Sequence, residues 1–128
     1  MNADVLAHWR HAERFLASAS ALIDMGDPDS AVSRAYYTAV HAVSALFAHE
    51  GQPFRKHEAV ESAVHRDLVR AGRVPITFGE DYTDLRQLRM RGDYAAGLPV
   101  DVATARAGVE RARRIVDTVR AMLPPELF

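Results

Sequence analysis

The segment between Gly26 and Gly51 limits the possible folds of this chain more than any other, because it is apolar almost all the way round a helix. Its apolar residues include Ala31, Val32, Tyr36, Tyr37, Val40, Val43, Leu46 and Phe47. A helix that is apolar on every side must be covered by neighbours on several sides. We therefore predict that this segment is the central helix of a larger assembly of helices.

Start and stop signals divide the chain into five predicted helices, and no period-two pattern is long enough to predict a strand. Asp27, Thr77 and Asp101 stand at capping positions, and glycine or proline follows each segment. The predicted helices cover residues 3–25, 28–50, 57–71, 77–91 and 102–123. Because the connections are short, we predict one all-α domain over residues 1–128, an antiparallel up-and-down bundle of about five helices.

The last predicted helix has the clearest amphipathic pattern. Its apolar residues, at spacings of three and four, are Val102, Ala105, Val109, Ala112, Val116, Val119 and Leu123. The opposite side is rich in arginine and carboxylates, and Glu110 is placed to pair with Arg114 four residues later. We expect a buried apolar side and a solvated charged side.

Composition excludes several functional classes. The 128 residues contain no cysteine, which excludes disulfides, thiolate zinc sites and a thiol nucleophile. Charged residues begin at Asp4, so the N-terminus does not have the pattern of a signal peptide, and the most apolar stretch is too short to span a bilayer. We expect a cytoplasmic protein with no membrane partner.

The formal net charge, which is only −1, also limits the functions that the protein can have. The protein as a whole does not attract nucleic acid, so any such site must be local. Of the 16 basic residues, 15 are arginine and only Lys56 is lysine. The bias has two explanations, genome composition or bidentate recognition of phosphate by guanidinium groups.

The central helix also carries four polar residues that need an explanation. Ser30, Arg34, Thr38 and His41 follow one another at spacings of four, four and three, which places them on one narrow stripe. The stripe is either the strip of the helix that meets water, or a site where Arg34 holds a phosphate and His41 transfers a proton. Both interpretations remain open at this point.

The densest basic cluster ends the fourth predicted helix, where Arg86, Arg89 and Arg91 occur within six residues. Guanidinium groups bind phosphate well, but the dipole at a helix C-terminus repels anions, so the side chains would have to dominate. Asp93 lies four residues after Arg89, and an ion pair between the two is the structural alternative.

Other motifs are weak or missing. His57, Glu61 and His65 are four residues apart and could bind a metal from one helix face, but such residues also recur on helix surfaces by chance. The sequence has no glycine-rich phosphate loop, no dinucleotide-binding fingerprint and no GxSxG elbow. We predict neither a metal nor a cofactor.

Three elements together resemble the HEPN family, named for higher-eukaryote and prokaryote nucleotide-binding domains. They are the run from Ser33 to Ala42, the pair Lys56-His57, and the stretch from Leu85 to Tyr94. The order of five helices and the loop lengths also agree, so the resemblance covers nearly the whole chain. It is strongest to a small, uncharacterised prokaryotic branch.

The resemblance implies a helical bundle that dimerises. It also implies that some members are metal-independent ribonucleases, often toxins beside a nucleotidyltransferase-like antitoxin. In those members an R-x(4-6)-H motif from two subunits meets in one cleft. The arginine steadies the scissile phosphate, and the histidine assists attack by the ribose 2′-hydroxyl.

This sequence departs from the motif. If Arg89 is the motif arginine, Tyr94 stands in place of the histidine, and a phenol is a poor base at pH 7. The two positions are also about 140° apart on an ideal helix, so they converge only if Gly92 loosens it. A second match, from Arg34 to His41, has six intervening residues but lies on the second helix.

We therefore expect a dimeric HEPN-like domain that binds RNA or a nucleotide, with weak or absent metal-independent endoribonuclease activity. The predicted catalytic residues are Arg89, Tyr94 and His41. The predicted binding residues are Arg34, Tyr37, His57, Arg86, Arg91 and Asp93. The alternative is a non-catalytic interaction module that partners a nucleotidyltransferase-like protein.

Overall fold

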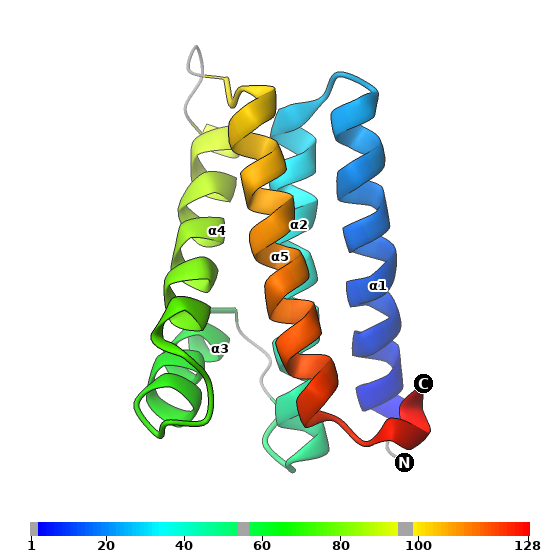
Figure 1. Cartoon of the computed structure of the whole chain (residues 1–128), viewed down its shortest axis with the longest axis vertical. Helices are drawn as coiled ribbons and strands as arrows, with labels where there is room; N and C mark the ends of the chain where they lie inside the picture. The colour runs from blue at the N-terminus through cyan, green and yellow to red at the C-terminus, as the bar shows by residue number, and fades with distance from the viewer. Residues whose placement is uncertain (1–2, 54–56, 95–98) are drawn as a thin grey trace.

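The computed structural model describes residues 3–53, 57–94 and 99–128, without the side chains of 57 and 92–94. Over these residues the protein is all-helical, as predicted. The elements are α1 (Ala3–Asp24), α2 (Pro28–His49), α3 (His57–Ala63), the π-helix η1 (Val64–Val69), α4 (Ile76–Tyr94), α5 (Val102–Met122) and the 3₁₀ turn η2 (Pro125–Leu127). The four long helices alternate up and down, and α3 lies at one end between α2 and α4 (Figure 1). None of the described helices is long and apolar enough to cross a membrane.

α2 is the central helix, which confirms the prediction from its sequence. It packs against α1, α4 and α5, and large side chains such as Leu46 and Phe47 are fully buried. Thr38 is also fully buried, and its hydroxyl donates to the Arg34 carbonyl oxygen at 2.9 Å. The polar stripe predicted on α2 is therefore not a uniform strip facing water, because Thr38 satisfies its hydroxyl within its own helix.

The predicted caps lie at one end of the bundle, where α1 ends and α2 and α5 begin (Figure 1). Gly26, with φ +81°, ends α1, and the Asp27 side chain accepts from the Ser30 N–H at 3.3 Å at the start of α2. Asp29 accepts from the Val100 N–H at 2.9 Å, which holds the start of α5 beside the start of α2. Asp101 then caps α5 by accepting from the Thr104 N–H at 2.7 Å.

The third predicted helix changes its character half-way. It is α-helical to Ala63 and continues as η1, and such π-helical turns are rare in proteins. η1 packs closely on α4 at Gly79, where a methyl group would lie 2.9 Å from Val69 Cγ2 and 3.0 Å from His65 Nδ1. The absence of a side chain at Gly79 therefore allows this approach.

Both ends of α4 differ from the prediction. The helix begins at Ile76, directly after Pro75, so Thr77 lies inside the first turn and does not cap it. At the other end α4 remains helical to Tyr94. Gly92 does not loosen the helix, and positions 89 and 94 stay about 140° apart around its axis.

The predicted pair between Glu110 and Arg114 is wrong. Arg114 reaches across to α4 and donates two hydrogen bonds to Asp81, at 3.0 and 2.9 Å. Asp81 is only 8% exposed, and a buried carboxylate needs hydrogen-bond donors more than the exposed Glu110 does. Glu110 instead accepts from Arg113 at 3.4 Å. The apolar side of α5 is buried as predicted, except for Val102 in its first turn.

Candidate functional site

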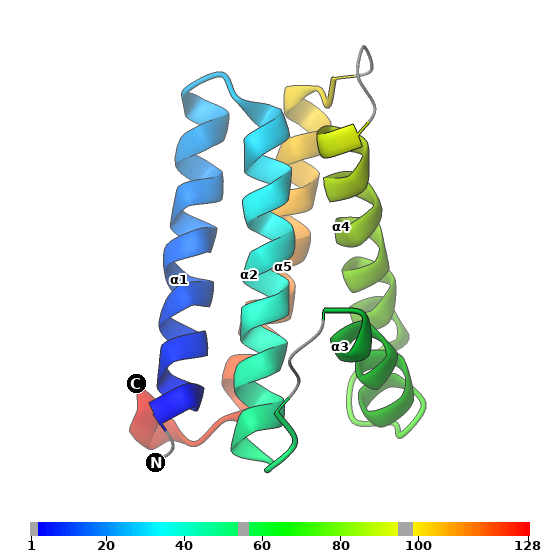
Figure 2. The ribbon, with the colours of Figure 1, turned by 180° about the vertical axis from the view of Figure 1, so that it is seen from behind.

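α2 has one side that no other helix covers completely, between α1 and α4, while α5 covers its opposite side (Figure 2). Arg34, Tyr37 and His41 follow one another there at spacings of three and four. Arg34 is exposed, and Tyr37 and His41 are half-buried. The helical spacing of these three residues therefore gives one accessible strip with a cation, a phenol and an imidazole.

α1 contributes an aromatic and imidazole cluster beside this strip. The Arg34 Cζ lies 4.9 Å from the centre of the Phe15 ring, and the same ring lies 5.4 Å from the His41 ring. His11 follows at 4.9 Å from His41, and its Nδ1 is 2.8 Å from Arg14 Nη2. Phe15 thus places the guanidinium of Arg34 and the imidazole of His41 on the same part of the surface.

His8 makes the shortest contact in this cluster. Its Nδ1 lies 2.9 Å from the Nδ1 of His41, across the packing of α1 on α2. Burial lowers the pKa of His8 below its usual value, while Asp4 raises it and His11 lowers it further. The pKa direction favours a neutral His8, which can share a hydrogen bond with a second imidazole.

α4 contributes Arg89 from the other side of α2. Its Cζ lies 5.3 Å from the Tyr37 ring centre and 5.6 Å from that of Tyr36. Such contacts stabilise a cation on an aromatic surface. Burial, helped by the carboxylate of Glu61, raises the pKa of Tyr36, so its phenol is protonated at neutral pH. Arg89 therefore brings a second positive charge next to Tyr37.

We call this surface the arginine–histidine face. It consists of His8, His11 and Phe15 of α1, Arg34, Tyr37 and His41 of α2, and Arg89 of α4. The sequence predicted a functional role for the four residues of α2 and α4, but not for the three residues of α1. The signal that could have found them is the spacing of positions 8, 11 and 15, which places two imidazoles and a ring on one side of α1.

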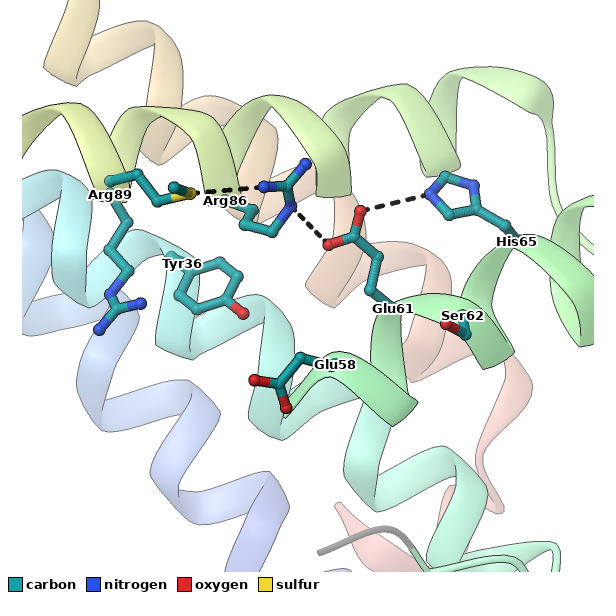
Figure 3. Close-up of a pocket in the computed structure, with 8 residues that line it drawn as sticks. Tyr36, Glu58, Glu61, Ser62, His65, Arg86 and Arg89 are labelled. Atoms are coloured by element: carbon teal, nitrogen blue, oxygen red, sulfur yellow. Dashed lines mark hydrogen bonds and ion pairs between the residues drawn. The ribbon is translucent and has the colours of Figure 1, made fainter. Parts of the chain in front are cut away.

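A pocket of about 480 Å³ lies next to this face, between α2, α3 and α4. It is lined by Tyr36, Glu58, Glu61, Ser62, His65, Arg86, Arg89 and Met90. Glu61 lies between Arg86 and His65 (Figure 3), with Arg86 Nε 2.7 Å and His65 Nε2 3.7 Å from its carboxylate. Thr83 also donates to Glu61 at 3.3 Å. Glu61 thereby joins α3 to α4 and already offsets the charge of Arg86.

The other predicted site residues lie elsewhere. Arg91 is exposed and lines a different pocket between α4 and α5, together with Asp84, Thr104 and Arg111. The side chains of the remaining three, His57, Asp93 and Tyr94, lie outside the described residues. The structure thus brings Arg34, Tyr37, His41 and Arg89 together and places Arg91 on another side of α4.

The sequence also offered a possible metal site, and the structure describes only part of it. Among the described side chains, no group of three or more histidines and carboxylates is arranged to hold a metal ion. Of the spaced trio considered from the sequence, Glu61 and His65 contact one another, and the side chain of His57 is not described.

Comparison with known proteins gives a family and a shared fold. The family profile described as HEPN domain matches residues 5–122. A UPF0332 protein from Thermotoga maritima is 28% identical over 120 residues, which are 93% of this chain and 91% of that protein. The crystal structure of TT1696 from Thermus thermophilus has a TM-score of 0.81 at 22% identity, over 96% of this chain and 100% of that one. The same helical bundle is thus found in an experimental structure.

Proposed function

Since this chain belongs to the HEPN domain family, we propose that it binds RNA and that the arginine–histidine face makes the contact. One observation carries the proposal. Arg89 lies over the Tyr37 ring from α4, and Arg34 is exposed one helical turn before Tyr37 on α2. One guanidinium therefore lies over Tyr37 and the other lies over Phe15 of α1, so a single strand that crosses α2 would meet both charges.

The chemistry of the face suits a single strand of RNA. Guanidinium groups form bidentate hydrogen bonds with phosphate oxygens, and aromatic rings stack on bases that are not paired. Tyr37 and Phe15 supply such rings within contact of Arg89 and Arg34. This local arrangement provides an attraction that the net charge of −1 does not.

The neighbouring pocket contributes less to phosphate binding. Arg86 is already paired with Glu61 at 2.7 Å, and Glu58 adds a second carboxylate to the pocket lining. A phosphate would have to displace Glu61 and overcome repulsion from both carboxylates. The exposed Arg34 is therefore better placed than Arg86 to contact phosphate.

Replacing Arg34 by alanine is expected to weaken binding of a labelled single-stranded RNA by about tenfold, because one charged hydrogen-bonding group is lost. The slope of log K against log salt should decrease by about 0.7, the value for one phosphate contact on a single strand. Fluorescence anisotropy across a salt series measures both quantities.

Arg113→Ala is the matched control, because Arg113 lies on the outer side of α5 and pairs with Glu110. It should leave affinity and slope unchanged. Equal losses in the two variants, or no loss in either, would contradict the proposed site.

A second candidate function is docking of a partner protein. Met25 and Val102 are 78% and 43% exposed, and both lie at the end of the bundle where α1 ends and α5 begins (Figure 1). A partner docked at this end would bury both apolar side chains. The partners implied by the family resemblance are a second copy of the chain and a nucleotidyltransferase-like protein. Failure to bind RNA, with co-purification of an adjacent gene product, would favour this function.

A further inference from the structure

The pocket between α2, α3 and α4 contains one carboxylate that the protein does not use. Glu58 lines this pocket and is exposed, and no ion pair or hydrogen bond joins its side chain to a described residue. Glu61, the other carboxylate of the lining, is already bound to Arg86, His65 and Thr83. An ionised carboxylate has two oxygens that only accept hydrogen bonds. Glu58 therefore offers a pair of acceptors to a ligand that brings two neighbouring donors.

The same pocket also contains hydrogen-bond donors. Arg86 uses Nε for Glu61 at 2.7 Å and Nη1 for the sulfur of Met90 at 3.4 Å, and a guanidinium has five N–H donors in all. Tyr36 keeps its phenolic proton, because burial raises its pKa. In the view of Figure 3, the Tyr36 hydroxyl lies between the side chains of Arg86 and Glu58. A ligand in this cavity of about 480 Å³ thus meets acceptors on one side and donors on the other.

We propose that this pocket receives a guanine base of the RNA strand bound on the arginine–histidine face, and that Glu58 accepts hydrogen bonds from its N1–H and N2–H groups. The inference rests on the proposed function, since it needs RNA at that face, and it adds a base preference to it. Arg89 connects the two places, because it lies over Tyr37 on the face and also lines the pocket. A strand that crosses the face can therefore place one unpaired base in the pocket.

Among the four RNA bases, only guanine matches this arrangement. Its Watson–Crick edge has two adjacent donors, N1–H and N2–H, followed by the acceptor O6. The two donors form parallel hydrogen bonds to one carboxylate, and Arg86 or Tyr36 donates to O6. Adenine and cytosine have a bare ring nitrogen beside the amino group, and uracil has one N–H between two carbonyl oxygens. Each of these three would direct a lone pair at the carboxylate of Glu58, which repels it.

The charges of the pocket favour a base over a phosphate. Its lining includes two carboxylates, Glu58 and Glu61, and two guanidinium groups, Arg86 and Arg89. A neutral base that enters the pocket adds no charge to this balance, whereas a phosphate is repelled by both carboxylates. The phosphates of the strand therefore stay on the arginine–histidine face, and the pocket selects the base.

The test compares single-stranded RNAs that differ in one base. The full chain is titrated with a short, labelled, uridine-rich RNA that has guanine, adenine or inosine at its centre, and fluorescence anisotropy gives the affinities. We expect guanine to bind about tenfold more tightly than adenine, which is the discrimination of one good bidentate contact. Inosine lacks the N2 amino group and keeps N1–H and O6, so its affinity should lie between the other two.

Glu58→Gln should abolish the preference, because an amide presents one acceptor and one donor instead of two acceptors. The lost negative charge strengthens binding of every RNA alike, so the measured quantity is the ratio of the guanine and adenine affinities. Glu80→Gln is the matched control. Glu80 is an exposed glutamate of α4 that does not belong to the pocket lining, so this variant should keep the wild-type ratio.

The outcomes separate this inference from the proposed function. If none of the RNAs binds, both fail. If all three RNAs bind with equal affinity, only the guanine pocket is overturned. A guanine preference that survives in Glu58→Gln, or inosine that binds as tightly as guanine, also overturns it. The comparison of the three bases uses the wild-type protein and does not depend on the folding of any variant.

Discussion

Arg114→Ala is expected to lower the free energy of unfolding by about 2 kcal/mol, because it removes both short hydrogen bonds to a buried carboxylate. Asp81 is 8% exposed and accepts from Arg114 at 3.0 and 2.9 Å. After the substitution its nearest cation is Arg111, whose Nε lies 4.0 Å away and also pairs with Asp84 at 3.5 Å. Urea denaturation followed by circular dichroism measures the change.

The matched control lies one residue away. Arg113→Ala removes the same side chain from the same helix, but Arg113 and Glu110 are both exposed. Exposed ion pairs contribute less than about 1 kcal/mol, so this variant should be close to wild type. If the two variants lost the same amount of stability, the ion pair between α4 and α5 would not have the importance that the burial of Asp81 indicates.

Gly79→Ala is expected to destabilise the protein by about 1 to 2 kcal/mol, although alanine normally stabilises a helix relative to glycine by about 1 kcal/mol. The new methyl group would lie 2.9 Å from Val69 Cγ2 and 3.0 Å from His65 Nδ1, so the side chains of η1 would have to shift away from α4. The unfolding midpoint in urea tests the sign of the effect.

Gly108→Ala provides the comparison within another helix. A methyl group there would meet Leu88 Cδ1 at 3.3 Å, and this atom is the end of a flexible, half-buried side chain that can move aside. We expect a change between zero and a stabilisation of about 1 kcal/mol. A stabilised Gly79→Ala variant would show that η1 does not need its close approach to α4.

Local signals explain why much of the fold could be predicted from the sequence. The apolar surface of α2 predicted its central position, and Asp27 and Asp101 predicted the starts of α2 and α5. Each of these signals acts over a few residues, through hydrogen bonds to nearby backbone N–H groups or through helical spacing. The HEPN resemblance, which also rests on short runs of sequence, is confirmed by the family match over residues 5–122.

Contacts between distant residues explain what the sequence did not predict. The partner of Arg114 lies 33 residues earlier, on α4. The rule that oppositely charged residues four apart on a helix form ion pairs considers one helix only, and it therefore predicted Glu110. η1 packs closely against Gly79, a contact that the sequence pattern around His65 does not show. Spacing rules within one helix contain no information about either contact.

The candidate site could likewise be predicted where it depends on spacing within one helix, but not where it depends on contacts between distant residues. The spacing of Arg34 and His41 on α2 placed them on one strip, and the structure brings Arg89 to the same face through Tyr37. The contact of His41 with His8, 33 residues earlier, depends on how α1 packs on α2. The sequence could therefore predict His41 as a member of the site but not its partner.

An NMR titration of the ¹⁵N-labelled protein with a single-stranded 2′-O-methyl RNA tests the central claim most directly. We predict that chemical-shift changes concentrate on the arginine–histidine face, including His8, Phe15, Tyr37 and His41, and that they decrease as salt is added. The outer side of α5, around Arg113 and Asp117, should not change. Shift changes confined to α5, or no changes at millimolar RNA, would contradict binding at this face.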